Sequence, residues 1–404
     1  MKAIATLLMA LGLLALSGLA RAETRVMVVT DLHYLEPSLY QGSDLFIRSL
    51  RNGDGKMTQR GEELMEALLL QIQAEKPDAL MVTGDLSFNG EQRSHLALAK
   101  WFHRVEEAGV PVWVIPGNHD IRSPRPMGFA EGLVYGTEGV TPEDFASIYG
   151  DFMGDYPKSG EAGFSYAVPV GDDLWVAMTD VSRYRDVGRT EGIFTDAHAA
   201  WLEEVLARAE GEKKKVITAS HHNLLPHSSF SPESFVMFGN EKMAALARRY
   251  GVEINLCGHI HMQHIAREDG LTDAALGAFC SWPHRYAILT ADADGEWRYE
   301  ARELKDEYLP EGFQAFSRDW FTGIARDKVR ASLSDGTEEE LDEMADFAAR
   351  FHAASFSGNL RKGDESWIRD PAFLLWEKRP EASFGQYLRL LMAEASEDPL
   401  HAGR

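Results

Sequence analysis

Cysteine is scarce in this chain, with only two in 404 residues, at positions 257 and 280. Cys257 adjoins the Gly258-His259 pair described below, and we expect it to pack beside that pair rather than to bind a metal. In an oxidising compartment the two cysteines would be able to form a disulfide, and two buried free thiols fit the sequence equally well. The sequence leaves both alternatives open.

Positive charge is also low. The chain has 41 Lys and Arg against 63 Asp and Glu, a formal net charge of −22. An acidic surface repels nucleic acid and anionic lipid headgroups, which both require basic patches. We therefore expect no nucleic-acid partner. Small phosphate esters remain suitable substrates, because bound metal ions would supply positive charge locally.

Only one long apolar run is present, from Ile4 to Leu19, preceded by Lys2 and followed by Ala20-Arg21-Ala22. This pattern predicts a secretory signal peptide over residues 1–22, cleaved after Ala22, rather than a membrane anchor, for which the run is short. No cysteine stands near the cleavage point, which argues against a lipoprotein. The mature chain is expected to be secreted or periplasmic, without a membrane span. Loss of Lys2 and Arg21 would bring its net charge to −24.

Polar blocks rich in Asp, Asn and His follow five short β-branched apolar runs. Such runs are typical of strands buried on both faces of an α/β sheet, whose carboxyl ends open onto a common crevice. The runs are residues 26–30, 79–83, 112–115, 216–220 and 254–257. The blocks are Asp31-Leu32-His33, Gly84-Asp85, Gly117-Asn118-His119-Asp120, His221-His222 and Gly258-His259-Ile260-His261.

Seven residues of these blocks are donors that transition metals accept. Imidazole, carboxylate and amide donors without a thiolate suit Zn, Fe, Mn or Co. One tetrahedral ion takes four ligands, so seven donors predict two ions, with Asp85 as the bridge because its block offers no other ligand. Two ions about 3.5–4 Å apart are a recurring device of phosphoryl hydrolysis. The donors are Asp31, His33, Asp85, Asn118, His221, His259 and His261.

The order of the five blocks, over residues 26–290, resembles the calcineurin-like metallophosphoesterase superfamily. The Asn118-His119-Asp120 block and the surroundings of Asn89 resemble its cyclic-nucleotide and glycerophosphodiester phosphodiesterase branch more than its protein phosphatases. The resemblance implies a two-sheet α/β/β/α sandwich and two transition-metal ions per chain. It assigns Asp85 to both ions. The other ligands of one ion would be Asp31, His33 and His261, and those of the second ion Asn118, His221 and His259.

The same resemblance implies the catalytic groups. His119 would protonate the leaving oxygen or steady the phosphoryl group, and Asp120 would orient and charge His119 through a hydrogen bond. Two neighbours are candidate substrate contacts. Asn89 is either a turn residue or a phosphate-contacting amide. In the His221-His222 pair the resemblance favours His221 over His222 as the metal ligand, and His222 would then support His221 or reach the substrate.

The chain is predicted to divide into a catalytic domain, residues 23–300, and a helical extension, residues 301–404, which would dock on that domain or form an oligomer interface. A capping box at Thr337 and Glu340 predicts an amphipathic helix in the extension. Further helices are expected from near Thr58, over 92–108 and over 196–209. We see no internal repeat.

Two segments, residues 34–56 and 124–155, are expected to be long loops that shape a small-molecule pocket. The run Asn52-Gly53-Asp54-Gly55-Lys56 is similar to a calcium-binding loop. It lacks carboxylates at the two ends of that loop, where Leu50 and Gly61 stand, so we interpret it as a turn.

The expected reaction is hydrolysis of a small phosphate ester by metal-bound hydroxide, with His119 as general acid. A phosphodiesterase is favoured. One alternative is a phosphomonoesterase, such as an exported phosphatase or nucleotidase. Another is a non-catalytic metal-binding scaffold, which the complete set of donors argues against.

Overall fold

The computed structural model describes residues 23–154, 161–185, 189–229, 235–292, 296–379 and 383–403. The predicted signal peptide lies outside the described residues. Over these ranges, no helix combines the length and the apolar character that crossing a bilayer requires.

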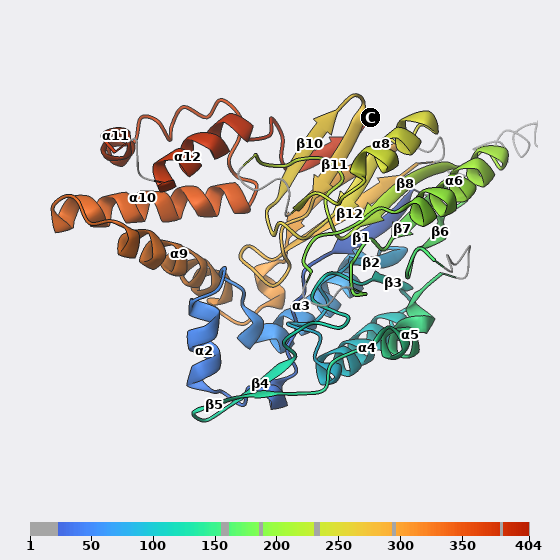
Figure 1. Ribbon diagram of the computed structural model, residues 1–404, viewed down its shortest axis with the longest axis horizontal. Coiled ribbons are helices and arrows are strands. Elements are labelled where there is room, and N and C mark those ends of the chain that lie inside the picture. The colour runs from blue at the N-terminus through green and yellow to red at the C-terminus, as the bar shows by residue number, and fades with distance from the viewer. Residues whose placement is uncertain are drawn as a thin grey trace, which may run out of the picture.

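Two six-stranded sheets form the centre of the molecule (Figure 1). The first has the order β14-β13-β12-β1-β2-β3, and its strands β1, β2 and β3 run parallel. Its strands are β1 Thr24–Val29, β2 Ala79–Thr83, β3 Val112–Ile115, β12 Arg285–Ala291, β13 Trp297–Glu303 and β14 His401–Gly403.

The second sheet has the order β10-β11-β9-β8-β7-β6, and β7, β8, β9 and β11 run parallel. Its strands are β6 Tyr166–Val170, β7 Leu174–Thr179, β8 Lys215–Ser220, β9 Ile254–Cys257, β10 His264–Glu268 and β11 Leu271–Ala275. The five strands predicted from apolar runs are therefore present as β1, β2, β3, β8 and β9.

The apolar runs are continuous because both faces of each sheet are covered. In β1, Val26 and Val28 belong to the core between the sheets, whereas Met27 and Val29 belong to the core under the helices. Helices α3 Gly61–Glu75 and α4 Gln92–Glu107 cover the first sheet, and α6 Asp196–Gly211 and α8 Asn240–Arg249 cover the second. This arrangement confirms the predicted α/β/β/α sandwich.

The two expected long loops contain short elements that the sequence did not reveal. Helix α2 Asp44–Arg51 lies within residues 34–56, and it buries Phe46 and Leu50, one turn apart, with Phe129. Residues 124–155 hold the hairpin β4 Met127–Ala130 and β5 Leu133–Gly136, and helix α5 Pro142–Tyr149. The expectation of irregular structure was wrong there, because tertiary contacts stabilise elements of only four to eight residues. The 3-10 helices are η1 Pro37–Leu39, η2 Thr58–Arg60, η3 Gly150–Phe152 and η4 Asp306–Tyr308.

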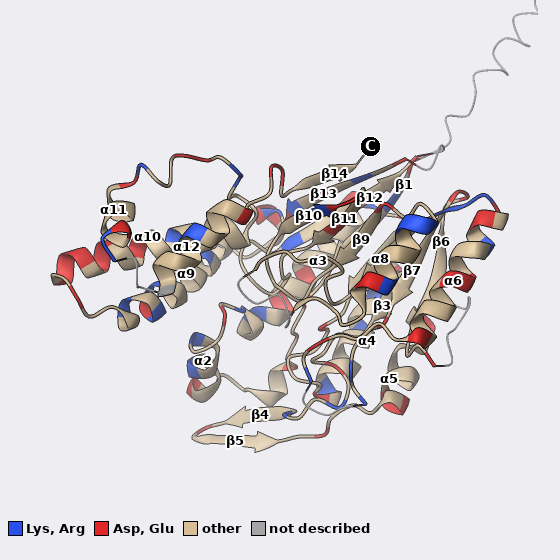
Figure 2. Ribbon diagram, turned by 45° about the horizontal axis from the view of Figure 1, so that its top comes forward, with Lys and Arg blue, Asp and Glu red and all other residues tan. Residues whose placement is uncertain are grey.

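The C-terminal helices extend from the sandwich as a separate arm (Figure 1). They are α9 Phe313–Ser332, α10 Glu338–Phe356, α11 Pro371–Glu377 and α12 Ser383–Glu394. The predicted capping box of Thr337 and Glu340 begins α10, and Phe347, Phe351 and Trp376 centre a core of their own. Beyond this arm, β14 returns to pair with β13, a strand that was not predicted. Basic and acidic residues intermingle along the helices of this arm (Figure 2).

Candidate metal centre

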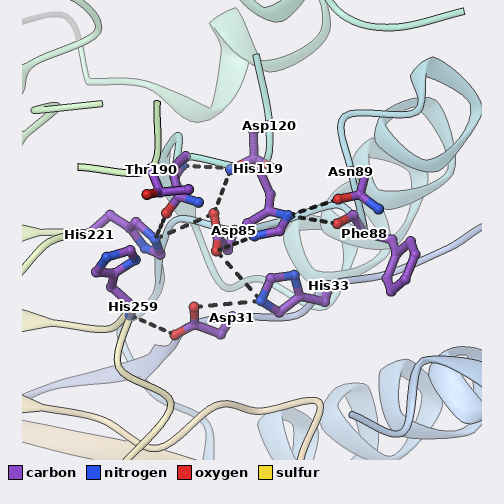
Figure 3. Close-up of polar contacts among 12 residues, drawn as sticks. Asp31, His33, Asp85, Phe88, Asn89, His119, Asp120, Thr190, His221 and His259 are labelled. Atoms are coloured by element: carbon purple, nitrogen blue, oxygen red, sulfur yellow. Dashed lines mark hydrogen bonds and ion pairs between the residues drawn. The ribbon is translucent and has the colours of Figure 1, made fainter. Parts of the chain in front are cut away.

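The seven predicted donors meet where the carboxyl ends of β1, β2, β3, β8 and β9 converge. Figure 3 shows five of them, Asp31, His33, Asp85, His221 and His259. Each donor follows its strand by one to four residues, so the parallel register of β1-β2-β3 and of β8-β9 carries the donors to one edge of the sandwich. The sandwich thus places together side chains that are more than 200 residues apart in the sequence.

The first group of donors surrounds a single point. The Nε2 atoms of His33 and His261 are 3.1 Å apart, His33 Nε2 is 3.5 Å from Asp85 Oδ2, and His261 Nε2 is 3.4 Å from Asp31 Oδ1. Donor atoms from Asp31, His33, Asp85 and His261 all lie within 4.8 Å of one another. Asp31 Oδ1 is buried and accepts no hydrogen bond. A cation among these atoms would compensate the buried acceptor.

The second group faces the other oxygen of Asp85. His221 Nε2 is 3.4 Å from Asp85 Oδ1 and 3.1 Å from Asn118 Oδ1. Donor atoms of Asp85, His221 and His259 lie within 4.8 Å of one another. The carboxylate of Asp85 therefore presents Oδ2 to one group and Oδ1 to the other, which is the arrangement of a bridging ligand.

Hydrogen bonds outside each donor set hold the donors in place. The Nδ1 atom of His221 is 3.0 Å from the Thr83 carbonyl, a contact that leaves Nε2 to face the centre. The amide of His259 donates to Asp31 Oδ2, and the amide of His119 donates to Asp85 Oδ1. Burial holds the pKa of His33 well below its usual value, which keeps this imidazole neutral, the form that binds metals. These residues fit two cations.

The backbone at the centre is strained. Five of the donors, Asp31, His33, Asp85, His259 and His261, have φ values between 40° and 70°. A non-glycine residue in this left-handed region costs about 1–3 kcal/mol, and such residues cluster at functional sites. Two glycines allow the close approach of the blocks. A Cβ on Gly117 would lie 2.2 Å from Asp85 Oδ1, and one on Gly258 would lie 2.0 Å from Thr30 Oγ1.

His119 lies at the edge of the centre. Its Nδ1 is 2.9 Å from the Phe88 carbonyl and 3.1 Å from Asn89 Oδ1, whereas its Nε2 is 4.0 Å from Asp85 Oδ2 (Figure 3). The side chain is 29% exposed. The bond to Phe88 leaves Nε2 as the atom that faces the donors and the solvent.

The predicted hydrogen bond from Asp120 to His119 is wrong. The Asp120 carboxylate accepts hydrogen bonds from the amides of Gly117, Leu86 and Ser87 and from the Ser87 hydroxyl. All four hydrogen bonds come from the two turns that carry Asp85 and Asn118. The Asp120 carboxylate therefore ties these two turns together. The Phe88 carbonyl and Asn89 take the role expected of Asp120.

The two candidate substrate contacts have different settings. Asn89 lies beside His119 and lines the cleft described below. His222 is fully buried, and its Nε2–H donates to the Thr190 carbonyl at 2.8 Å. Its ring centroid is 4.3 Å from that of His259. In this position His222 supports His259 and has no surface open to a substrate.

Two residues that the sequence analysis assigned to a turn reach the centre. Asp54 Oδ2 is 3.0 Å from His261 Nδ1, and Lys56 Nζ is 3.4 Å from Asp54 Oδ2. Helix α9 holds this turn, since Trp320 Nε1 donates to the Lys56 carbonyl and Phe321 lies against Gly55. The only sign of this role in the sequence is that Asp54 and Lys56 place a carboxylate and an amine in a glycine-rich segment.

Both cysteines are free and buried. Cys257 lies in a third cluster with His227 and Asp273. The Asp273 carboxylate there is engaged by the amides of Leu224 and Leu225 and by the Asn255 side chain. These contacts already satisfy the Asp273 carboxylate, so we interpret this cluster as part of a buried polar network.

A cleft of about 110 Å³ adjoins Asn118 and His119, and we call it the arginine cleft. Its walls come from the segments after β2, after β3 and after β7. It is lined by Asn89, Gly117, Asn118, His119, Ile121, Arg122, Ser123, Pro124, Arg125, Arg183, Tyr184, Arg189 and Thr190.

Comparison with known proteins agrees with this geometry. Residues 24–263 match the model of the calcineurin-like phosphoesterase family, and residues 297–398 match the C-terminal domain of cyclic nucleotide phosphodiesterase. The fold and the family match define a metal-dependent phosphoric ester hydrolase. The chain belongs to the calcineurin-like phosphoesterase family, as the resemblance of its five blocks predicted.

Two relatives are similar over more than half of this chain. A probable cyclic nucleotide phosphodiesterase of Pseudoalteromonas sp. is 24% identical over 241 residues, covering 60% of this chain and 72% of the relative. Another from Synechococcus sp. is 26% identical over 242 residues, covering 57% and 79%. Among solved structures, a dimetal phosphatase from Danio rerio aligns with a TM-score of 0.49 and 15% identity, over 70% of this chain and 96% of the other.

Proposed function

We propose that this protein hydrolyses a small-molecule phosphodiester at a centre of two transition-metal ions. The observation that carries the proposal is the position of Asp85, whose two carboxylate oxygens each face a separate group of donors. Fe, Mn, Zn or Co suit the nitrogen and oxygen donors present.

The proposed ligands are divided between the two groups. Asp31, His33, Asp85 and His261 would hold one ion, and Asp85, Asn118, His221 and His259 the other. When bound, such ions activate water for attack and neutralise charge on the phosphoryl oxygens. The protein contributes a preorganised site, because buried ligands fixed by backbone hydrogen bonds do not need to reorganise during the reaction.

His119 is the proposed general acid. Its Nδ1–H bond to the Phe88 carbonyl aims Nε2 at the space beside Asp85. A proton on Nε2 can then pass to the leaving oxygen as the P–O bond breaks, which is the usual task of histidine at neutral pH. Asn89 Oδ1 is a second acceptor beside Nδ1 of His119, and it favours a proton on Nδ1. Asp120 acts indirectly, by joining the turns that carry Asp85 and His119.

Phosphodiesters are the favoured substrates, with cyclic nucleotides as the first class to examine. Two features support this choice. The relatives with this catalytic part are described as probable cyclic nucleotide phosphodiesterases, and residues 297–398 match the C-terminal domain of such an enzyme.

We further propose that residues 1–22 form a signal peptide cleaved after Ala22, that residues 23–300 form the catalytic domain, and that residues 301–404 form a helical extension able to mediate oligomerisation. Mass analysis of protein recovered from an exporting host should find a chain that begins at Glu23. Retention of residues 1–22 would refute cleavage.

The decisive experiment is a turnover screen of the mature protein loaded separately with Mn, Fe, Co and Zn. The substrates are a cyclic nucleotide, bis(4-nitrophenyl) phosphate and 4-nitrophenyl phosphate. We expect about two ions per chain by elemental analysis and faster hydrolysis of the diesters. Asp85→Ala should lose both ions and activity, whereas the exposed control Asp319→Ala should keep both. One ion per chain after full loading would refute the dinuclear centre, and faster monoester hydrolysis would refute the diesterase assignment.

A further inference from the structure

The arginine cleft carries a charge opposite to that of the whole chain. Four arginines line it, and no acidic side chain is among its lining residues. The chain as a whole has 63 acidic residues against 41 basic ones. A patch that only held solvent would be expected to follow the average composition, with acids interspersed. The concentration of one sign at the mouth of the catalytic centre therefore indicates an anionic ligand. The four arginines are Arg122, Arg125, Arg183 and Arg189.

Two of these guanidinium groups are available for a ligand. Over the described part of the chain, the side chains of Arg122 and Arg125 have neither a hydrogen bond nor an ion pair with protein atoms. Arg189 lies 3.9 Å from Glu191 and remains 55% exposed. Guanidinium groups bind phosphate with two parallel hydrogen bonds, which makes arginine the preferred residue for this ligand.

The backbone fixes where Arg122 stands. Its φ is 48°, and its amide donates to the Val140 carbonyl at 2.8 Å. A left-handed conformation is uncommon for a long side chain and persists where surrounding contacts impose it. Arg122 lies two residues after Asp120, whose carboxylate anchors the turn of His119. The arginine is thus carried on the same tied turn as the proposed general acid.

The charge of the reacting group alone does not account for the cleft. A phosphodiester carries one negative charge, and two metal ions with His119 would already face it. A cyclic mononucleotide would bring no counter-charge to the arginines. A substrate with a second phosphate would, if its reacting diester lies at Asn118 and His119 while the second phosphate enters the cleft.

We propose that the arginine cleft binds a second phosphate group of the substrate, so that the preferred substrates are phosphodiesters that carry one further phosphate. This inference rests on the proposed diesterase function and names its substrate class. Tyr184, which also lines the cleft, offers an aromatic face to the nucleoside or other group that joins the two phosphates.

A matched pair of substrates tests the inference. Thymidine 5′-(4-nitrophenyl phosphate) is prepared with its 3′-hydroxyl free or phosphorylated, so that the reacting diester and the leaving group are the same. We expect the metal-loaded protein to have a kcat/KM at least about tenfold higher for the phosphorylated substrate, chiefly through a lower KM. This preference should shrink as ionic strength rises.

Arginine variants locate the effect. Arg122→Gln and Arg125→Gln should each lower the ratio of the two kcat/KM values several-fold, and the double variant should bring it near one. Arg208→Gln, on α6 and outside the cleft, is the matched control and should keep the wild-type ratio. Equal kcat/KM values for the two substrates in the wild type, or a preference that survives in the double variant, would overturn the inference.

A binding measurement separates this inference from the proposed function. Thymidine 3′,5′-bisphosphate and thymidine 5′-monophosphate are titrated into the metal-loaded protein by calorimetry, which needs no turnover. Tighter binding of the bisphosphate, lost in the double variant, supports the cleft even if no diester is hydrolysed. Equal binding overturns it even if bis(4-nitrophenyl) phosphate is turned over rapidly.

Discussion

The contact between Asp54 and His261 leads to a quantitative prediction about metal affinity. Asp54 Oδ2 is 3.0 Å from His261 Nδ1, while His261 Nε2 faces Asp31 and His33. Loss of a carboxylate that orients a ligating histidine costs about 10–100-fold in metal affinity or activity. Asp54→Ala also leaves the amine of Lys56 without its partner beside a cation site. We therefore expect a 10–100-fold loss of affinity for the ion that His261 would hold.

Asp54→Asn should have a smaller effect. Its amide oxygen can still accept the Nδ1–H bond, and the Asp54 side chain is 48% exposed, so solvent screens much of its charge. We expect a loss below about tenfold for this variant. Lys56→Ala added to Asp54→Ala should recover part of the affinity, because the unpaired amine is then absent.

The assay is a metal titration of chelator-treated protein. Mn²⁺ or Zn²⁺ is added back, and both the ions bound per chain and the hydrolysis of bis(4-nitrophenyl) phosphate are followed. Asp319→Ala, an exposed aspartate on α9, is the control. Wild-type affinity in Asp54→Ala, or an equal loss in Asp319→Ala, would show that Asp54 does not position His261.

Three further predictions concern other contacts. His119→Ala should retain two ions but lose about 10²–10⁴-fold in rate on an alkyl ester and much less on a nitrophenyl ester, whose leaving group departs without a proton; equal losses would remove His119 from the general-acid role. Gly55→Ala should lower both thermal stability and metal affinity, because Gly55 has φ 93° and an added Cβ would lie 2.5 Å from Phe321 Cδ2. An unchanged metal titration in this variant would show that α9 does not hold the Asp54 turn. Burial raises the pKa of Glu91 from 4.5 to about 7, so the folded state binds the extra proton and stability falls as pH rises through this window. Relative to wild type, Glu91→Gln should gain about 2–3 kcal/mol between pH 5 and pH 8 in denaturant unfolding, and parallel pH profiles would contradict this.

Much of the fold follows from the sequence because its signals are local. A strand covered on both faces must be apolar at every position, so β2 and β9 are visible as runs of four or five residues. A capping box needs only Thr337 and Glu340, three residues apart, and it marks the start of α10. The donors are visible for the same reason, since each follows directly on its strand.

Other features escaped because their signals are not local. Helix α2 and the hairpin β4-β5 are too short to be stable alone, and they form because Phe46 and Phe129 bury each other. Strand β14 has three residues and exists because β13 offers it an edge. The predicted hydrogen bond between Asp120 and His119 was wrong, because adjacency in the sequence does not determine which way a carboxylate points in a tight turn.

The sequence by itself therefore determined the sandwich and the chemical identity of the donors, since strand burial and ligand type are properties of short segments. Only the tertiary structure decided which atoms face one another. It turned the two oxygens of Asp85 toward different donor groups, brought Asp54 across 207 residues to His261, and gathered four arginines beside His119. Such contacts depend on how distant turns pack and on the left-handed backbone that packing imposes, and no local pattern encodes either of them.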